Sequence, residues 1–265
     1  MILVVIVIAT VAALLFGLRC QGEKDFIVEY FPAGVGNWWE HEYRFLIVVY
    51  DTVLNDTSEN LFVDSLHDEI VGINTVAGWS CYRFHEATYD NTRWFAHPDS
   101  ALLFIASLID RDPGFAASSS GDMIYGLHGM IFGTTSEVAS YMKNLTIGLD
   151  WNLDVDTAYL TPPQKCYVYP MGVGTSWIRM IDPWYEEIEA VSSDSVTVPA
   201  GTFCTLRLRI ERDIGIDDER YLWISEEGMI RDSMYARGVA INAVGDTVGY
   251  FDVYTIYDLL SLNIE

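Results

Sequence analysis

Basic residues are scarce in this sequence. The chain of 265 residues has 15 Lys+Arg against 38 Asp+Glu, which gives a formal net charge of -23. Because phosphate binding requires a basic face, this composition excludes nucleic acid as a partner. It also excludes adhesion to anionic lipid by electrostatics alone. The hydrophobic share of 51% excludes a disordered acidic tail, so we expect a folded acidic protein.

Motifs of catalysis and of metal binding are also missing. Cys81, Cys166 and Cys204 are spaced too widely for a Cys-x-x-Cys site, and neither His-Glu-x-x-His nor Gly-x-Ser-x-Gly occurs. The cysteines form one disulfide and leave one free thiol, or they are small buried hydrophobic side chains. We therefore expect no catalytic residue, no cofactor and no metal, and a protein that is not an enzyme. A carboxylate-dependent hydrolase stays a lower alternative, since only three-dimensional spacing reveals a working carboxylate pair.

One acidic stretch looks like the opening of a calcium loop, with ligand-type side chains at alternate positions: Asp150, Asn152, Asp154 and Asp156. The pattern departs from such a loop because Val155 stands where glycine is needed and Thr161 where a bidentate glutamate belongs. An acidic strand face or linker is the favoured interpretation.

Long stretches with the 3.6-residue period of helices are missing, whereas alternation with period two is common. Residues 43–50, 205–212 and 249–257 are rich in β-branched and aromatic side chains, as strands are. In residues 205–212 the leucines and isoleucine share one face, and Arg207 and Arg209 share the other, which predicts a half-buried antiparallel strand. The best helical candidate is 136–144, with a cap at Thr134, Thr135 or Ser136. The chain is therefore expected to be mainly β with few short helices.

Two segments of the chain echo each other. Residues 30–39 and 168–177 share the pattern aromatic-Pro-x-Gly-Val-Gly-x-x-Trp, and residues 76–81 parallel 199–204. Proline fixes φ and glycine permits positive φ, so each opening predicts a turn that leads into a strand with a buried tryptophan. Two correspondences in the same order predict an internal duplication into two related antiparallel β units. We place the first unit at 26–147, a linker at 148–164 and the second unit at 165–265.

The N-terminal segment, residues 1–20, is an apolar run that ends in Arg19 and Cys20. Its length lies between a signal-peptide core and a membrane-spanning helix. The cysteine after the run resembles the processing site of bacterial lipoproteins, in which that residue is lipidated. Two features depart from that family: Arg19 replaces the small residue before the cysteine, and no basic stretch precedes the run. We predict export with lipidation of Cys20; a cleaved signal, an uncleaved anchor and a cytoplasmic orientation are the alternatives.

A second resemblance lies in the C-terminal half. Residues 198–203 (Val-Pro-Ala-Gly-Thr-Phe), followed by a strand and by residues 227–231, resemble a pattern of uncharacterised bacterial envelope lipoproteins. The opening Pro-x-Gly-Val-Gly-x-x-Trp is also typical of them. The resemblance implies an antiparallel sheet curved around a helix or an apolar groove, as in periplasmic lipoprotein carriers. It brings no catalytic residues.

These observations predict an exported, membrane-tethered cell-envelope protein in the periplasm, at the outer membrane or on the cell surface. It would act as a non-catalytic binding or interaction module whose partners are the membrane, through the N-terminal segment, and an envelope protein or apolar ligand. The alternative is a carrier of apolar ligands such as lipid or lipoprotein, which requires a continuous apolar cavity of about 300–1,000 Å³. The acidic residues are interpreted as a solvated surface and not as a site.

Overall fold

The protein is built almost entirely from antiparallel strands. The computed structural model describes residues 26–88, 90–108, 123–147, 157–180, 185–213, 218–242 and 245–265. Within these ranges there is one helix, α2 (Thr135–Ile147). The strands are β1 (Trp38–Asp51), β2 (Asp56–Val76), β3 (Trp79–Glu86), β4 (Asn91–Ala96), β5 (Ala101–Leu108), β6 (Met123–Leu127), β7 (Met130–Phe132), β8 (Thr157–Val168), β9 (Ser176–Met180), β10 (Glu186–Val198), β11 (Gly201–Arg212), β12 (Asp218–Ser225), β13 (Gly228–Asn242) and β14 (Thr247–Asn263).

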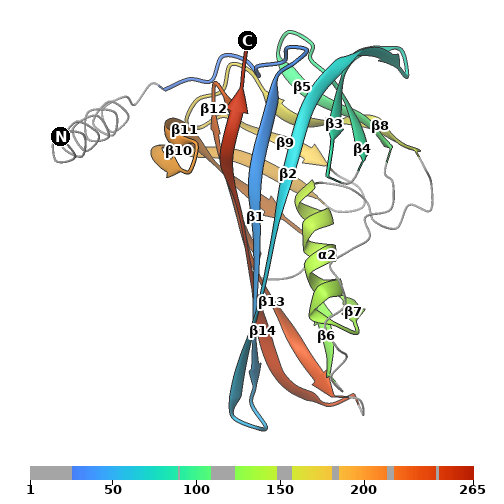
Figure 1. Cartoon of the computed structure of the whole chain (residues 1–265), viewed down its shortest axis with the longest axis vertical. Coiled ribbons are helices and arrows are strands. Elements are labelled where there is room, and N and C mark those ends of the chain that lie inside the picture. The colour runs from blue at the N-terminus through green and yellow to red at the C-terminus, as the bar shows by residue number, and fades with distance from the viewer. Residues whose placement is uncertain are drawn as a thin grey trace, which may run out of the picture.

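One large sheet contains all of these strands and curves until its two ends meet (Figure 1). The order along it is β8-β5-β4-β3-β2-β1-β14-β13-β12-β11-β10-β9; β6 pairs with β13, and β7 pairs with β6. The end strands approach each other: the Trp177 indole on β9 donates to the Lys165 carbonyl on β8 at 3.1 Å. The prediction of a mainly β protein with a curved antiparallel sheet is confirmed.

The alternation in the sequence determines which side chains point inward. On β1 the aromatic and branched residues Tyr43, Phe45 and Ile47 are fully buried, and their neighbours are only partly covered. On β11 the leucines and isoleucine of 205–212 are buried while Arg209 is exposed and pairs with Glu189 at 2.8 Å. The predicted half-buried strand is thus confirmed.

Helix α2 covers the inner face of the long strands β1, β2, β13 and β14 (Figure 1). Val138, Ala139 and Met142 are buried in the cluster that includes Phe45 and Phe251. The helix begins as predicted: the Glu137 amide donates to the Thr134 hydroxyl at 3.1 Å, and the Glu137 carboxylate accepts from the Gly133 amide at 2.6 Å. These contacts satisfy amides that lack partners at a helix start.

The two echoing turns have the same local geometry. Gly36 and Gly174 both adopt positive φ, +96° and +91°, and the tryptophan that follows each, Trp39 or Trp177, is buried. Three backbone hydrogen bonds recur: Gly36 to Ile70, Ile70 to Asn37 and Asn37 to Gly34 in one copy, and Gly174 to Ala190, Ala190 to Thr175 and Thr175 to Gly172 in the other. The recurrence supports an internal duplication, which stays a prediction.

Part of the expected linker between the two units is a strand of the sheet. Strand β8 includes residues 157–164 of that linker, so this part of the segment pairs with β5 in the sheet. The candidate calcium-loop residues 150–156 and the lipidation candidate Cys20 lie outside the described residues. Within the described ranges, no helix combines the length and apolar character needed to cross a membrane.

Candidate functional site

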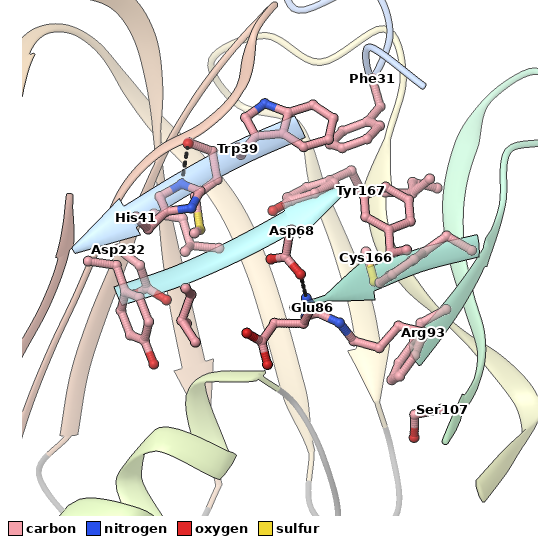
Figure 2. Close-up of a pocket in the computed structure, with 18 of the residues that line it drawn as sticks. Phe31, Trp39, His41, Asp68, Glu86, Arg93, Ser107, Cys166, Tyr167 and Asp232 are labelled. Atoms are coloured by element: carbon pink, nitrogen blue, oxygen red, sulfur yellow. Dashed lines mark hydrogen bonds and ion pairs between the residues drawn. The ribbon is translucent and has the colours of Figure 1, made fainter. Parts of the chain in front are cut away.

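A cavity of about 200 Å³ lies inside the curved sheet, above helix α2 (Figure 2). Its walls are inward-facing side chains from most of the strands, because alternate residues of every strand point to the enclosed side. The lining residues are Phe31, Trp39, His41, Leu66, Asp68, Phe84, Glu86, Asn91, Arg93, Phe95, Leu102, Phe104, Ser107, Leu108, Gln164, Cys166, Tyr167, Arg179, Arg220, Leu222, Met229, Asp232 and Tyr257.

One wall of the cavity is aromatic. Five rings touch in sequence: Phe31 and Trp39 have centroids 5.6 Å apart, Trp39 and Phe84 6.1 Å, Phe84 and Phe95 4.9 Å, and Phe95 and Phe104 5.0 Å. The Trp39 indole is held in place because its nitrogen donates to the Glu227 carbonyl at 2.6 Å. This wall presents flat apolar faces to whatever occupies the cavity.

Beside the aromatic wall lies a group of charged side chains. Asp68 on β2 and Glu86 on β3 are directly opposed in the register of the two strands, so both project into the enclosed side. Arg93 on β4 forms an ion pair with Asp68, and its charge also acts on Glu86 (Figure 2). Burial raises the pKa of Glu86, and Asp68 raises it further. Two carboxyl groups here share one guanidinium.

The opposite wall contains further buried ion pairs. Arg220 binds Asp232 with two hydrogen bonds, Nε to Oδ1 at 3.1 Å and an Nη to Oδ2 at 2.6 Å. Behind the cavity Glu186 accepts a hydrogen bond from the Arg212 Nε at 2.7 Å and forms an ion pair with Arg179 at 2.8 Å. Burial alone would raise the pKa of Glu186, but the guanidinium groups of Arg179, Arg212 and Arg220 lower it to about 2. These arginines are therefore engaged by internal carboxylates.

His41 and Cys166 also line the cavity. The His41 Nε2 donates to the Met229 carbonyl at 3.0 Å, and burial lowers the pKa of the ring. Cys166 is a free thiol whose pKa burial raises to about 11, so the reactive thiolate is disfavoured. Within the described residues, neither forms a hydrogen bond with a base or nucleophile of the kind that acyl transfer requires.

The other residues singled out in the sequence are scattered. The five histidines lie on separate strands and turns, and within the described ranges no three potential ligands come together as a metal site. Among the described residues, Cys81 is a buried free thiol.

The charged cavity residues were not identified from the sequence. The sequence did contain a pattern that marks them: single charged residues at strand positions whose neighbours two residues away are apolar. On β2 the inward row is Leu66, Asp68, Ile70, and on β13 it is Ile230, Asp232, Met234. An interpretation of all acidic residues as solvated surface therefore missed those that line the cavity.

Comparison with known proteins gives little beyond this geometry. No protein-family model and no curated protein matches the sequence. Among solved structures, the chain is similar to the crystal structure of "a putative exported protein with YmcC-like fold" from Bacteroides fragilis, with a TM-score of 0.36 and 12% identity. The similarity covers 89% of this chain and 99% of that one. At this level the similarity carries no argument about function.

Proposed function

We propose that the protein is an exported, membrane-tethered binding module of the cell envelope and that the cavity inside the curved sheet is its binding site. The observation that carries the binding role is the cavity itself, which combines an apolar aromatic wall with polar groups that can orient a ligand. Binding sites for small molecules have this composition, mostly apolar with a few placed polar groups.

Export and tethering rest on the sequence. The apolar run before Cys20 and the absence of acidic residues within it favour a targeting segment. Since the net charge of -23 opposes adhesion to anionic lipid, a lipid or apolar anchor would supply the membrane affinity that the folded part lacks. Labelling cells with a radioactive fatty acid tests this: the wild-type chain should take up label and a Cys20→Ala variant should not. Equal labelling of both would exclude lipidation at Cys20.

The size and charge of the cavity favour a small ligand over a lipid. Its volume of about 200 Å³ is below the 300–1,000 Å³ or so of typical ligand pockets. Its walls also include Arg93, Arg220 and the carboxylates that pair with them, and burying such groups against an acyl chain is costly. The carrier hypothesis therefore has less support than a binding module for a small, partly polar molecule.

One observation favours a second candidate, a carboxylate-dependent hydrolase. Asp68 is ion-paired with Arg93, whereas the pKa of its neighbour Glu86 is raised by burial. A carboxylate held by a guanidinium beside a carboxyl group of raised pKa is the kind of pairing that glycoside hydrolysis uses. Turnover of nitrophenyl glycosides that is abolished by Glu86→Gln would support this function.

The binding site can be tested with two neighbouring tryptophans as reporters. Trp39 lines the cavity, and Trp38, the preceding residue, faces outward and contacts His67 with centroids 5.3 Å apart. Benzyl alcohol is titrated into the protein, and the indole N–H resonances are followed by NMR. The Trp39 resonance should shift and the Trp38 resonance should not.

A variant that fills the cavity provides the control for this titration. Ser107 is buried and lines the cavity, so Ser107→Leu should weaken the response without unfolding the protein, as checked by circular dichroism. Equal shifts of both tryptophans, or a response unaffected by Ser107→Leu, would contradict binding in the cavity.

A further inference from the structure

The charged side chains that line the cavity balance one another. Three are guanidinium groups and three are carboxyl groups: Arg93, Arg179 and Arg220 with Asp68, Glu86 and Asp232. Burial lowers the pKa of His41, the remaining basic side chain of the described lining, so its neutral form is favoured at pH 7. The overall charge of the lining therefore favours neither a positive nor a negative ligand.

Each of these charged groups is already engaged inside the protein. Glu86 accepts from the Thr88 amide at 2.8 Å, and the charge of Arg93 also acts on it. Ion pairs hold all three guanidinium groups of the lining: Arg93 with Asp68, Arg179 with Glu186 and Arg220 with Asp232. We call these contacts the charge network of the cavity.

An ionised ligand would disturb this charge network. A ligand anion would have to displace a carboxylate from its arginine, and a ligand cation would have to compete with the arginine for the carboxylate. Either exchange leaves a buried charge without its partner, which is strongly unfavourable. An uncharged ligand leaves all the pairs intact.

The apolar part of the cavity suits one flat ring. On the aromatic wall Phe84 meets Phe95 edge-on at 70°, and Phe95 lies nearly parallel to Phe104 at 24°. Aromatic rings favour contacts of both kinds, so an aromatic ligand can extend the row. A cavity of about 150 Å³ lined by apolar side chains holds one benzene molecule, and one of about 200 Å³ therefore holds one ring with a short substituent.

A polar atom in the lining lacks a hydrogen-bond donor. Asn91 on β4 lines the cavity, and its side-chain oxygen is buried and accepts no hydrogen bond from the residues that the structure describes. A buried acceptor without a donor is costly. A hydroxyl or amide N–H group of a ligand would donate to this oxygen without bringing a charge.

We propose that the cavity binds an uncharged molecule with one aromatic ring and one hydroxyl or N–H group. The ring lies on the aromatic wall, and the hydroxyl or N–H group donates to the Asn91 oxygen. The proposal rests on the function proposed above and names the class of ligand for that same site. Benzyl alcohol is a simple member of this class.

Four analogues of benzyl alcohol each change one of these properties. Benzylammonium and benzoate carry a charge, toluene lacks the donor, and cyclohexylmethanol lacks the aromatic ring. Titrated into the full chain at pH 7 and followed by the Trp39 indole resonance, benzyl alcohol should bind at least tenfold more tightly than either ion. It should also bind at least threefold more tightly than toluene and cyclohexylmethanol. Both of these are more apolar than benzyl alcohol, so the hydrophobic effect alone would give the opposite order.

Asn91→Leu removes the acceptor and keeps a side chain of similar size. It should weaken the binding of benzyl alcohol at least fivefold and change that of toluene less than twofold. A matched control is Asn74→Leu, which makes the same substitution at an exposed position of β2 outside the cavity and should change both less than twofold. If Asn91→Leu does not fold, the comparison of benzyl alcohol with toluene on the wild-type protein tests the hydrogen bond by itself.

The outcomes separate this proposal from the proposed function. Binding of benzoate or benzylammonium as tight as that of benzyl alcohol would overturn the uncharged class. Binding of toluene as tight as that of benzyl alcohol, or equal effects of Asn91→Leu and Asn74→Leu, would overturn the hydrogen bond, and equally tight cyclohexylmethanol would overturn the aromatic ring. The cavity stays a binding site in each of these cases. If none of the probes shifts Trp39, the binding function itself is contradicted.

Discussion

Breaking the buried pair of Arg220 and Asp232 tests whether the walls of the cavity are shielded from bulk water. Both side chains are almost fully buried, at 3% and 1% exposure, and they share two hydrogen bonds. Burial acts to lower the pKa of Arg220, but Asp232 outweighs it and the pKa is raised. Arg220 therefore stays charged, and Asp232→Asn leaves a buried cation without its main partner.

The expected cost follows from the burial of the pair. Removing one partner of a buried ion pair costs about 3–5 kcal/mol of unfolding free energy. Glu186 also acts on Arg220, so we expect the lower end, about 3 kcal/mol, for Asp232→Asn. For a chain of this size that corresponds to a fall of about 6–12 °C in Tm.

Urea denaturation and calorimetry measure this cost against two reference variants. Glu189→Gln removes a carboxylate from an exposed pair with Arg209, with 43% and 42% exposure, and should cost less than about 1 kcal/mol. The double variant Arg220→Met with Asp232→Leu replaces the whole pair with apolar side chains and should be within about 1 kcal/mol of wild type or more stable. If Asp232→Asn costs no more than Glu189→Gln, water reaches the pair and the reasoning about a shielded charge network is wrong.

Three further predictions concern single positions. Burial and then Arg212 lower the pKa of His128 from 6.5 to about 4, so the folded state takes up this proton less readily than the unfolded chain. The stability that neutral His128 contributes is present above pH 6.5, and about 1–3 kcal/mol of it is lost as the pH falls toward 4. Asn tolerates positive φ, so His128→Asn should fold. Its unfolding free energy, measured by urea titration, should lack this fall between pH 6.5 and pH 4. Cys166, with a pKa near 11, should react with iodoacetamide at pH 8 more than tenfold more slowly in the folded protein than in urea, and equal rates would contradict its burial. Gly36→Ala and Gly174→Ala should each cost about 1–2 kcal/mol because of their positive φ, whereas Gly72→Ala should be neutral or slightly stabilising in the same denaturation assay; clearly unequal costs would count against equivalent turns.

Local features of the fold were predictable from the sequence because they depend on residues close together in the chain. The cap at Thr134 and the first-turn Glu137 identify the helix start, and both make the contacts that such residues make. The glycines of the two echoing turns mark positions where φ is positive. The alternation on β11 indicates which side is buried, since side chains of a strand point to opposite faces.

The candidate site was not predictable, because its members come from strands far apart in the chain. Asp68, Glu86 and Arg93 meet only through the register of three neighbouring strands, and Asp232 faces the same space from the other half of the sheet. In the sequence these residues cannot be separated from the many acidic residues that face solvent.

The sequence alone therefore determined the class of fold, the faces of the strands, the turns and the helix start, because each is set by local propensity and periodicity. The tertiary structure alone decided that the sheet curves until β8 and β9 meet and that a charged cavity forms inside it. The physical reason is that alternation assigns a side chain to one face of a strand. Which residues then share an enclosed space depends on strand order, register and curvature.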